Sequence, residues 1–313
     1  KLEAIADMTP EDILHAVENK DLQEVLGTLP RWENGDALPP LSQNWAEQTE
    51  ALAAFHKRNG YGLFASYAAF EWRDHALSPI SATDPIQLSD LKNYELQRSQ
   101  VVDNTESFVC GLPANNVLLY GDRGTGKSST IHAILNAYKE QGLRMIEIPK
   151  SAVEELSLIR EYLADSPMKF IIYIDDLSFD SQDNAFTELK AALEGGLSAC
   201  QPNTLIYATS NRRHLIKENF SDREDDVNKN DTRQEQLSLS DRFGLTITFI
   251  NPDKKDYLDI VEKIAADRGL QVDAQRLDAA AEQWAVRRGG RSPRCARQFI
   301  DHVESALRRG KEW

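Results

Sequence analysis

The sequence predicts an α/β fold, in which helices cover both faces of a parallel β-sheet and a helical region lies at each end of the chain. Three observations support this prediction. Short apolar runs between residues 117 and 250 alternate with helix-like segments, which is the pattern of parallel β-α units. These runs are continuous rather than alternating, as expected for strands buried on both faces. From residue 252 onward the periodicity is helical only.

We expect residues 1–85 to form an N-terminal helical region. Thr9 followed by Pro10 is typical of a helix start. Residues 45–62 and 63–73 are aromatic-rich segments that we interpret as helices. Their aromatic side chains are expected to form core. The alternative is an exposed stripe that binds a protein client.

The clearest motif follows the first apolar run. Residues 117–128 read VLLYGDRGTGKS, a strand that ends in G-x-x-x-x-G-K-S. Glycines leave backbone N–H groups free to curl around phosphate oxygens, and the N-terminus of the next helix adds positive charge. The lysine reaches the β- and γ-phosphates, and the serine hydroxyl suits Mg²⁺. The motif therefore predicts a site for a nucleoside triphosphate, made of Gly121, Asp122, Arg123, Gly124, Thr125, Gly126, Lys127, Ser128 and Ser129.

Two more predicted strands end in polar residues suited to this site. The run FIIYI is followed by Asp175 and Asp176, at the sheet edge where ligands bind in open α/β folds. Asp175 suits the Mg²⁺ shell, and Asp176 suits the orientation or deprotonation of the attacking water. The alternative is a pair that caps the next helix. Asn211 follows the run LIYATS. Its amide can donate to a γ-phosphate, although asparagine is also a common turn residue.

Two arginines are further candidates. Arg242 precedes the last predicted strand and is either a surface charge or an arginine finger for a neighbouring subunit. Arg294 falls in the first turn of the last helix, after Ser292 as N-cap and Pro293. A cation there opposes the helix dipole unless a polyphosphate binds. A solvated basic face and a nucleic-acid surface are the alternatives.

Composition restricts the environment of the protein. A net charge of -14 opposes nonspecific attraction to nucleic acid or anionic membrane. Cys110, Cys200 and Cys295 lie far apart without metal-ligand spacing, which favours a reducing cytoplasm. No apolar stretch reaches the length of a membrane span. We therefore expect a cytoplasmic protein without a membrane segment, and leave nucleic-acid binding open.

The motifs together resemble those of a known superfamily. GDRGTGKS, IIYIDD, ATSN, SLSDRFG and GGRSPRCARQF are similar in order and spacing to Walker A, Walker B, sensor 1, arginine finger and sensor 2 of AAA+ ATPases. With GLPANNVLLYG and DDLSF, the chain resembles a bacterial group of AAA+ ATP-binding proteins of unknown function (domain of unknown function 815). The resemblance implies an αβα base domain over 86–251, with a five-stranded sheet in the order 5-1-4-3-2, and a helical lid over 252–313. It also implies ATP at the base–lid seam and a homo-oligomer.

The resemblance also implies a role for each candidate residue. One departure matters, because the superfamily usually has glutamate at the position of Asp176, and the shorter aspartate bears on the rate of hydrolysis. The implied roles are phosphate and Mg²⁺ contacts for Lys127 and Ser128, Walker B for Asp175 and Asp176, sensor 1 for Asn211, the finger for Arg242, sensor 2 for Arg294 and an adenine contact for Tyr94.

We therefore expect a Mg²⁺-dependent ATPase that remodels or loads a macromolecular partner. The alternative is an ATP-controlled binding module with little or no hydrolysis, which the short Asp176 would suit. A GTPase is disfavoured. Residues 228–231 match the guanine-reading pattern N-K-x-D and residues 241–244 match D-x-x-G. The first match has no apolar strand before it, and the two occur in reversed order.

Overall fold

The computed structural model describes residues 49–179, 184–194, 202–211 and 241–313. The helix start expected at Thr9 lies outside these residues. The strands are β1 (Ala69–Arg73), β2 (Ala76–Pro79), β3 (Val117–Gly121), β4 (Leu143–Glu147), β5 (Lys169–Ile174), β6 (Thr204–Ser210) and β7 (Leu245–Phe249). The helices are α4 (Thr49–Asn59), α5 (Leu63–Ser66), η1 (Leu88–Asp90), α6 (Glu95–Val109), α7 (Lys127–Tyr138), η2 (Lys139–Gln141), η3 (Lys150–Glu155), α8 (Leu156–Leu163), α9 (Asn184–Glu194), α11 (Lys254–Asp267), α12 (Ala274–Arg288) and α13 (Pro293–Arg308).

Five adjacent strands of the sheet, from β4 to β7 at one edge, have the predicted topology. The strands stand in the order β2-β1-β4-β5-β6-β3-β7. The pairs β3–β7, β3–β6, β5–β6 and β4–β5 are all parallel. Numbered from β3 along the chain, these five strands read 5-1-4-3-2, as the resemblance implies. Strand β3 therefore lies between β6 and β7, so the loop at its carboxyl end is flanked by two other strand ends.

Two predictions were wrong in part. The described sheet has seven strands rather than five. Of residues 63–73, which we expected to be helical, only Leu63–Ser66 form a helix. Residues 69–73 form β1, which pairs in parallel with β4, and β2 pairs with β1 in antiparallel. Phe70 and Trp72 pack into the core on one face of the sheet, while Ala69 packs on the other. This period of two is the strand pattern. The alanine-rich composition favours a helix locally, but pairing with the open edge of β4 overrides it.

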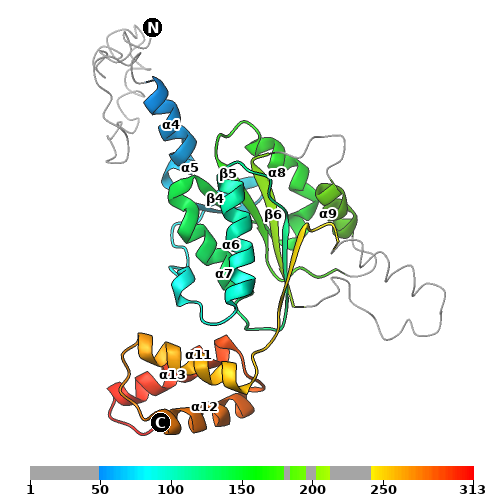
Figure 1. The fold of residues 1–313 in the computed structure, drawn as a ribbon. Coiled ribbons are helices and arrows are strands. Elements are labelled where there is room, and N and C mark those ends of the chain that lie inside the picture. Colours follow the sequence, from blue (N-terminus) through cyan, green and yellow to red (C-terminus); the bar gives the residue numbers. More distant parts are fainter. Residues whose placement is uncertain (1–48, 180–183, 195–201, 212–240) are drawn as a thin grey trace, which may run out of the picture.

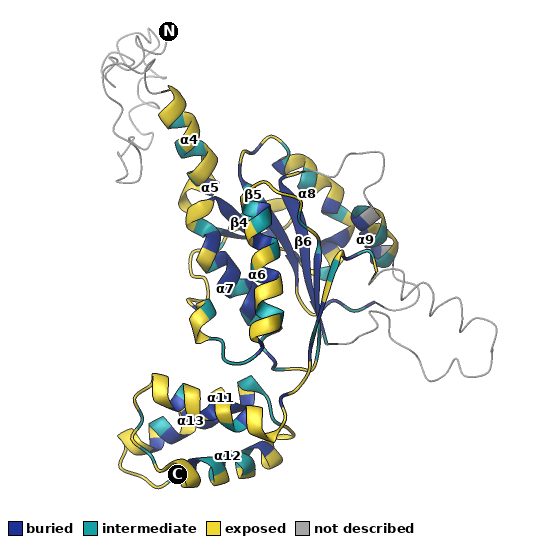
Figure 2. Cartoon of the chain, viewed as in Figure 1, coloured by how far each residue is buried: buried dark blue, intermediate teal, exposed yellow. Residues whose placement is uncertain are grey.

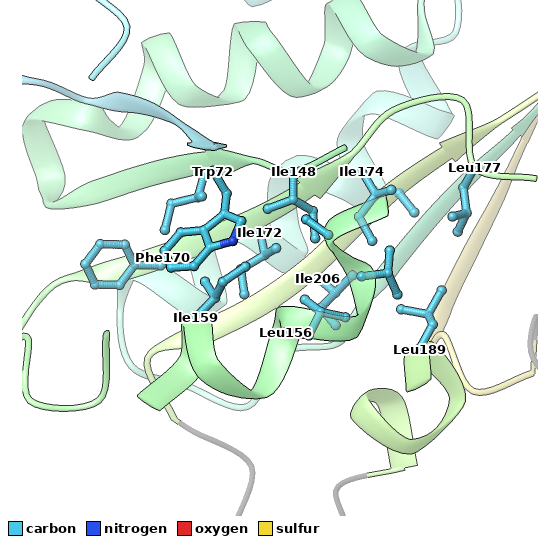
Figure 3. Close-up of a cluster of buried hydrophobic side chains, with 14 of the residues drawn as sticks. Trp72, Ile148, Leu156, Ile159, Phe170, Ile172, Ile174, Leu177, Leu189 and Ile206 are labelled. Atoms are coloured by element: carbon cyan, nitrogen blue, oxygen red, sulfur yellow. The ribbon is translucent and has the colours of Figure 1, made fainter. Parts of the chain in front are cut away.

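Helices cover both faces of the sheet, as predicted (Figure 1). On one face, α6 and α7 contribute Val101 and Ile131 to a cluster that includes Leu119. On the other face, η3, α8 and α9 pack against β4, β5 and β6 (Figure 3). Figure 2 shows the strands buried between these layers, while the outer sides of the helices are exposed. The hydrophobic cluster on the face covered by η3, α8 and α9 includes the residues labelled in Figure 3, which are Trp72, Ile148, Leu156, Ile159, Phe170, Ile172, Ile174, Leu177, Leu189 and Ile206.

The C-terminal helices form a bundle that lies beyond one end of the sheet, whereas α4 lies beyond the opposite end (Figure 1). Tyr257, Leu277 and Phe299, one from each helix, are buried together in its core. Helix α13 begins as predicted, with Ser292 as N-cap accepting a hydrogen bond from the Cys295 amide and with proline at the first helical position. Within the described residues, no helix combines the length and the apolar character that crossing a membrane requires.

Candidate nucleotide site

The glycine-rich loop joins β3 to α7 as the sequence predicts. Gly121 ends β3 with φ 131°, and a Cβ atom there would lie 1.9 Å from the carbonyl oxygen of Phe249. Real Cβ atoms do not approach so closely, so only glycine fits this position. Gly126, with φ 97°, is the N-cap of α7. The first amides of α7 and its positive dipole end therefore face the loop, an arrangement that binds anions.

Lys127 is almost completely buried at the centre of the loop. Its ammonium group donates to the carbonyl oxygens of Gly121 (2.9 Å) and Asp122 (2.7 Å) and to Oδ1 of Asn211 (3.2 Å). Burial lowers the pKa of Lys127, and the carboxylates of Asp122, Asp176 and Asp175 oppose this effect. The group is thus held among oxygen atoms at the place where the motif requires a phosphate contact.

Asp175 accepts hydrogen bonds from three hydroxyl groups. Oδ1 accepts from Ser128 (2.8 Å), Tyr173 (2.6 Å) and Thr209 (2.5 Å). Partial burial raises the pKa of Asp175, but the bonds from Thr209, Tyr173 and Ser128 outweigh it, and the pKa lies below its ordinary value. Tyr173 and Thr209 are site residues that were not predicted from the sequence. A period of two places Tyr173 on the same strand face as Asp175, which could have identified it.

Asp176 and Asn211 come from the ends of neighbouring strands and form a direct pair. The Asn211 amide nitrogen donates to Oδ1 of Asp176 at 2.5 Å, and the backbone amide of Asp176 donates to Oγ1 of Thr209 at 3.0 Å. Asp176 has φ 47°, a left-handed conformation that is uncommon for residues other than glycine. Lys127, Asn211 and Asp176 therefore form one chain of hydrogen bonds that joins the start of α7 to the ends of β6 and β5.

A cavity of about 520 Å³ lies between this loop and the C-terminal bundle. The bundle contacts the loop directly: the backbone amide of Arg294 donates to the carbonyl oxygen of Gly124 at 3.1 Å. Tyr94 also lines the cavity; its hydroxyl donates to the Ile250 carbonyl at 2.6 Å and its ring lies 5.2 Å from that of Phe249. The polar lining comprises Lys92, Asn93, Tyr94, Arg98, Arg123, Thr125, Lys127, Ser128, Ser129, Thr130, Asp175, Asp176, Thr209, Asn211, Arg294 and Arg297.

Three predicted residues stand apart from the described lining of this cavity. Gly121 lies beneath the loop, against β7. The carboxylate of Asp122 accepts a hydrogen bond from the amide of Asn251. Arg242 lies in a turn directly before β7. Arg98, which was not predicted as a site residue, lines the cavity instead.

Comparisons with known proteins identify the family of this chain. Residues 65–307 match the family described as "Protein of unknown function (DUF815)". No curated protein matches the chain.

Solved structures with similarity include a single-substitution variant of RuvB from Thermotoga maritima, with 18% sequence identity and a TM-score of 0.49, covering 71% of this chain and 65% of that one. The FIGL-1 AAA domain in complex with ADP is 17% identical, with a TM-score of 0.47, covering 72% of this chain and 75% of that one. The chain thus spans slightly less than two thirds of the RuvB variant. The family match covers most of the sequence, including the glycine-rich loop and most of the C-terminal bundle, and the chain belongs to the family of proteins of unknown function DUF815.

Proposed function

We propose that this protein binds Mg·ATP in the cavity between base and lid and hydrolyses it, as an ATPase of the AAA+ type. One observation carries the proposal. Lys127, Asp175 and Asn211, from three different elements, converge within hydrogen-bond distance of one glycine-rich loop. A lysine, a Mg²⁺-binding carboxylate and a neutral amide are the groups that phosphoryl transfer uses.

The residues present fit a magnesium ion. The Ser128 hydroxyl and the Asp175 carboxylate are oxygen donors in direct contact, and the lowered pKa keeps Asp175 ionised at neutral pH. Mg²⁺ commonly uses one or two protein oxygens and takes its other ligands from phosphate and water. When bound, the ion would neutralise charge on the phosphate oxygens.

The remaining groups have roles in transfer. Lys127 binds the β- and γ-phosphates as a point charge. Asp176, held by Asn211, orients the attacking water and accepts its proton. Arg294, on the lid, faces the phosphates from the other side, where a guanidinium stabilises charge that develops in the transition state.

A second candidate function is an ATP-controlled binding module with little or no hydrolysis. The observation in its favour is Asp176, which is shorter than the usual glutamate and is already bonded to Asn211. Steady-state phosphate release with Mg²⁺, and with the metal chelated, decides between the two, alongside titration of a fluorescent ATP analogue. Binding without release supports the module. Absence of binding contradicts both.

We also propose that the protein acts as a homo-oligomer in the cytoplasm, remodelling or loading a macromolecular partner, with a protein client at the N-terminal region. The position of Arg242 supports the oligomer. It lies directly before β7, outside the described lining of the cavity of its own chain, as expected for a group that serves a neighbour. The net charge of -14 disfavours nonspecific nucleic-acid binding.

A further inference from the structure

The base and the lid are joined by residues 250–253, which run from the end of β7 to the start of α11. We call this segment the base–lid linker. Its orientation helps to set where the lid, with Arg294 and Arg297, stands relative to the phosphate loop, alongside the direct ion pair between Lys92 and Asp267. One contact with it comes from the glycine-rich loop and another from Tyr94, which lines the cavity.

From the phosphate side, the contact comes from Asp122. Its backbone amide donates to the Phe249 carbonyl at 2.8 Å, and its carboxylate Oδ2 accepts from the Asn251 amide at 2.7 Å. The pattern G-x-x-x-x-G-K-S makes no demand at this position, since phosphate contacts come from the backbone, the lysine and the serine. The Asp122 side chain is therefore available for another role, and it is bonded to the linker.

The second contact comes from Tyr94, which lines the cavity. Its hydroxyl donates to the Ile250 carbonyl at 2.6 Å. The side chain is 8% exposed, and its ring packs on Phe249. Asn93 and Tyr94 are consecutive left-handed residues, with φ 66° and 62°. That conformation is uncommon outside glycine, and Asn93 Oδ1 stabilises it by accepting from the Tyr94 amide at 2.9 Å.

The lid itself touches the phosphate loop at one further place. The Arg294 amide donates to the Gly124 carbonyl, and a Cβ atom on Gly124 would lie 3.0 Å from Ser292 Oγ and 3.2 Å from Arg294 Cβ. There is thus little free space between the start of α13 and the loop. A small change in linker direction would separate them.

We propose that Asp122 and Tyr94 are positioning residues, which hold the base–lid linker so that Arg294 stands over the phosphate loop. This inference rests on the proposed ATPase function for its catalytic consequence, but the contacts themselves do not depend on that function. Asp122 holds the linker at the Asn251 amide and Tyr94 holds it at the Ile250 carbonyl.

The first test measures lid position without nucleotide. Spin labels are attached to Cys110, exposed at the end of α6, and to a cysteine introduced by Gln283→Cys on the exposed side of α12, with Cys200 replaced by serine. The pulsed-EPR distance distribution should broaden and shift in Asp122→Ala and in Tyr94→Phe, which removes the hydroxyl alone. Asp122→Asn keeps an acceptor oxygen and should match the parent protein.

A matched control removes the same kind of bond elsewhere. Asp273 accepts from the Arg276 amide at 2.8 Å at the start of α12, away from the linker, so Asp273→Ala should leave the distance unchanged. Melting temperatures verify that each variant is folded. A folded Asp122→Ala and a folded Tyr94→Phe that both keep the parent distribution would overturn the proposal.

The second test measures turnover at saturating ATP. Misplacing a catalytic group by about 1 Å can reduce rates by roughly 100-fold, so kcat should fall by about 10- to 100-fold in Asp122→Ala and Tyr94→Phe and be retained in Asp122→Asn. A changed lid distance with unchanged kcat overturns the positioning role. If the parent protein does not hydrolyse ATP, the proposed function fails, and the ligand-free distances alone decide whether the two residues hold the lid.

Discussion

Asn211 donates its side-chain amide to the Asp176 carboxylate at 2.5 Å, although the two residues are 35 positions apart in the sequence. The same asparagine accepts from Lys127 through its oxygen. Both ends of one amide are therefore engaged, which orients it without ambiguity between donor and acceptor. Asn211 therefore links Asp176, which we propose to orient the attacking water, to Lys127, which we propose to bind phosphate.

Asp176→Asn should reduce ATP hydrolysis by about 100-fold or more while leaving nucleotide affinity nearly unchanged, because it removes the proposed base without touching the phosphate loop. Phosphate release and titration of an ATP analogue measure the two quantities. Asp165→Asn, on an exposed turn at the far end of β5, is the control. Equal turnover in both variants would mean that Asp176 is structural.

Lys127→Ala should weaken ATP binding by roughly 10- to 100-fold, which corresponds to the ~1.5–3 kcal/mol of a charge-assisted phosphate contact. Lys139→Ala, just beyond the other end of α7, should bind as the parent does. Isothermal calorimetry in the presence of Mg²⁺ measures both. Parental affinity in Lys127→Ala would exclude the loop as the phosphate site.

Gly121→Ala should destabilise the protein by roughly 2–5 kcal/mol, because a strained φ and a close contact with Phe249 add together. Gly111 is the matched control. It also has a positive φ, of 77°, but an added Cβ meets no atom within 4 Å, so Gly111→Ala should lose only about 1–2 kcal/mol. Urea denaturation measures the difference, and equal losses would contradict the predicted clash.

Asp175 gives a pH dependence with a defined sign. Its pKa is lowered in the folded state, so its contribution to stability is fully present above the ordinary carboxyl value of about 3.9 and is lost as pH falls through the lower folded value. Asp175→Asn does not titrate. The free energy of unfolding should therefore fall less steeply below about pH 4 in this variant than in the parent. Parallel pH profiles would contradict the assignment.

Arg242→Ala should bind ATP normally but hydrolyse it roughly 1000-fold more slowly, as expected for loss of an arginine finger. Mixing it with Lys127→Ala is the sharper experiment. In mixed assemblies, an intact loop from one variant can face an intact Arg242 from the other, so part of the activity should return. No recovery, in mixtures that light scattering shows to co-assemble, would place Arg242 in its own subunit's site or in a structural role.

The sequence was sufficient where local patterns decide the structure. The strand, glycine loop and helix around Lys127 are contiguous in the sequence. The N-cap role of Ser292 depends only on the residues of the helical turn that follows it. The sequence was insufficient where distant segments meet. Ala69–Arg73 becomes a strand only because β4 offers an edge, and the Asp122 carboxylate meets the Asn251 amide 129 positions away. Neither contact leaves a pattern within a short window of sequence.

The strands added before the loop also affect how the folded protein avoids aggregation. Within the described chain, β2 is the outermost strand on the β4 side of the sheet. It is four residues long and ends in Pro79, which has no N–H to offer to another chain. Short edge strands that carry proline resist pairing with strands of other molecules. Without β1 and β2, the apolar strand β4 would be the edge of the sheet and would expose unpaired backbone N–H and C=O groups. Because β1 and β2 cover it, the edge of the sheet is instead a short strand with a proline, which disfavours pairing with strands of other molecules.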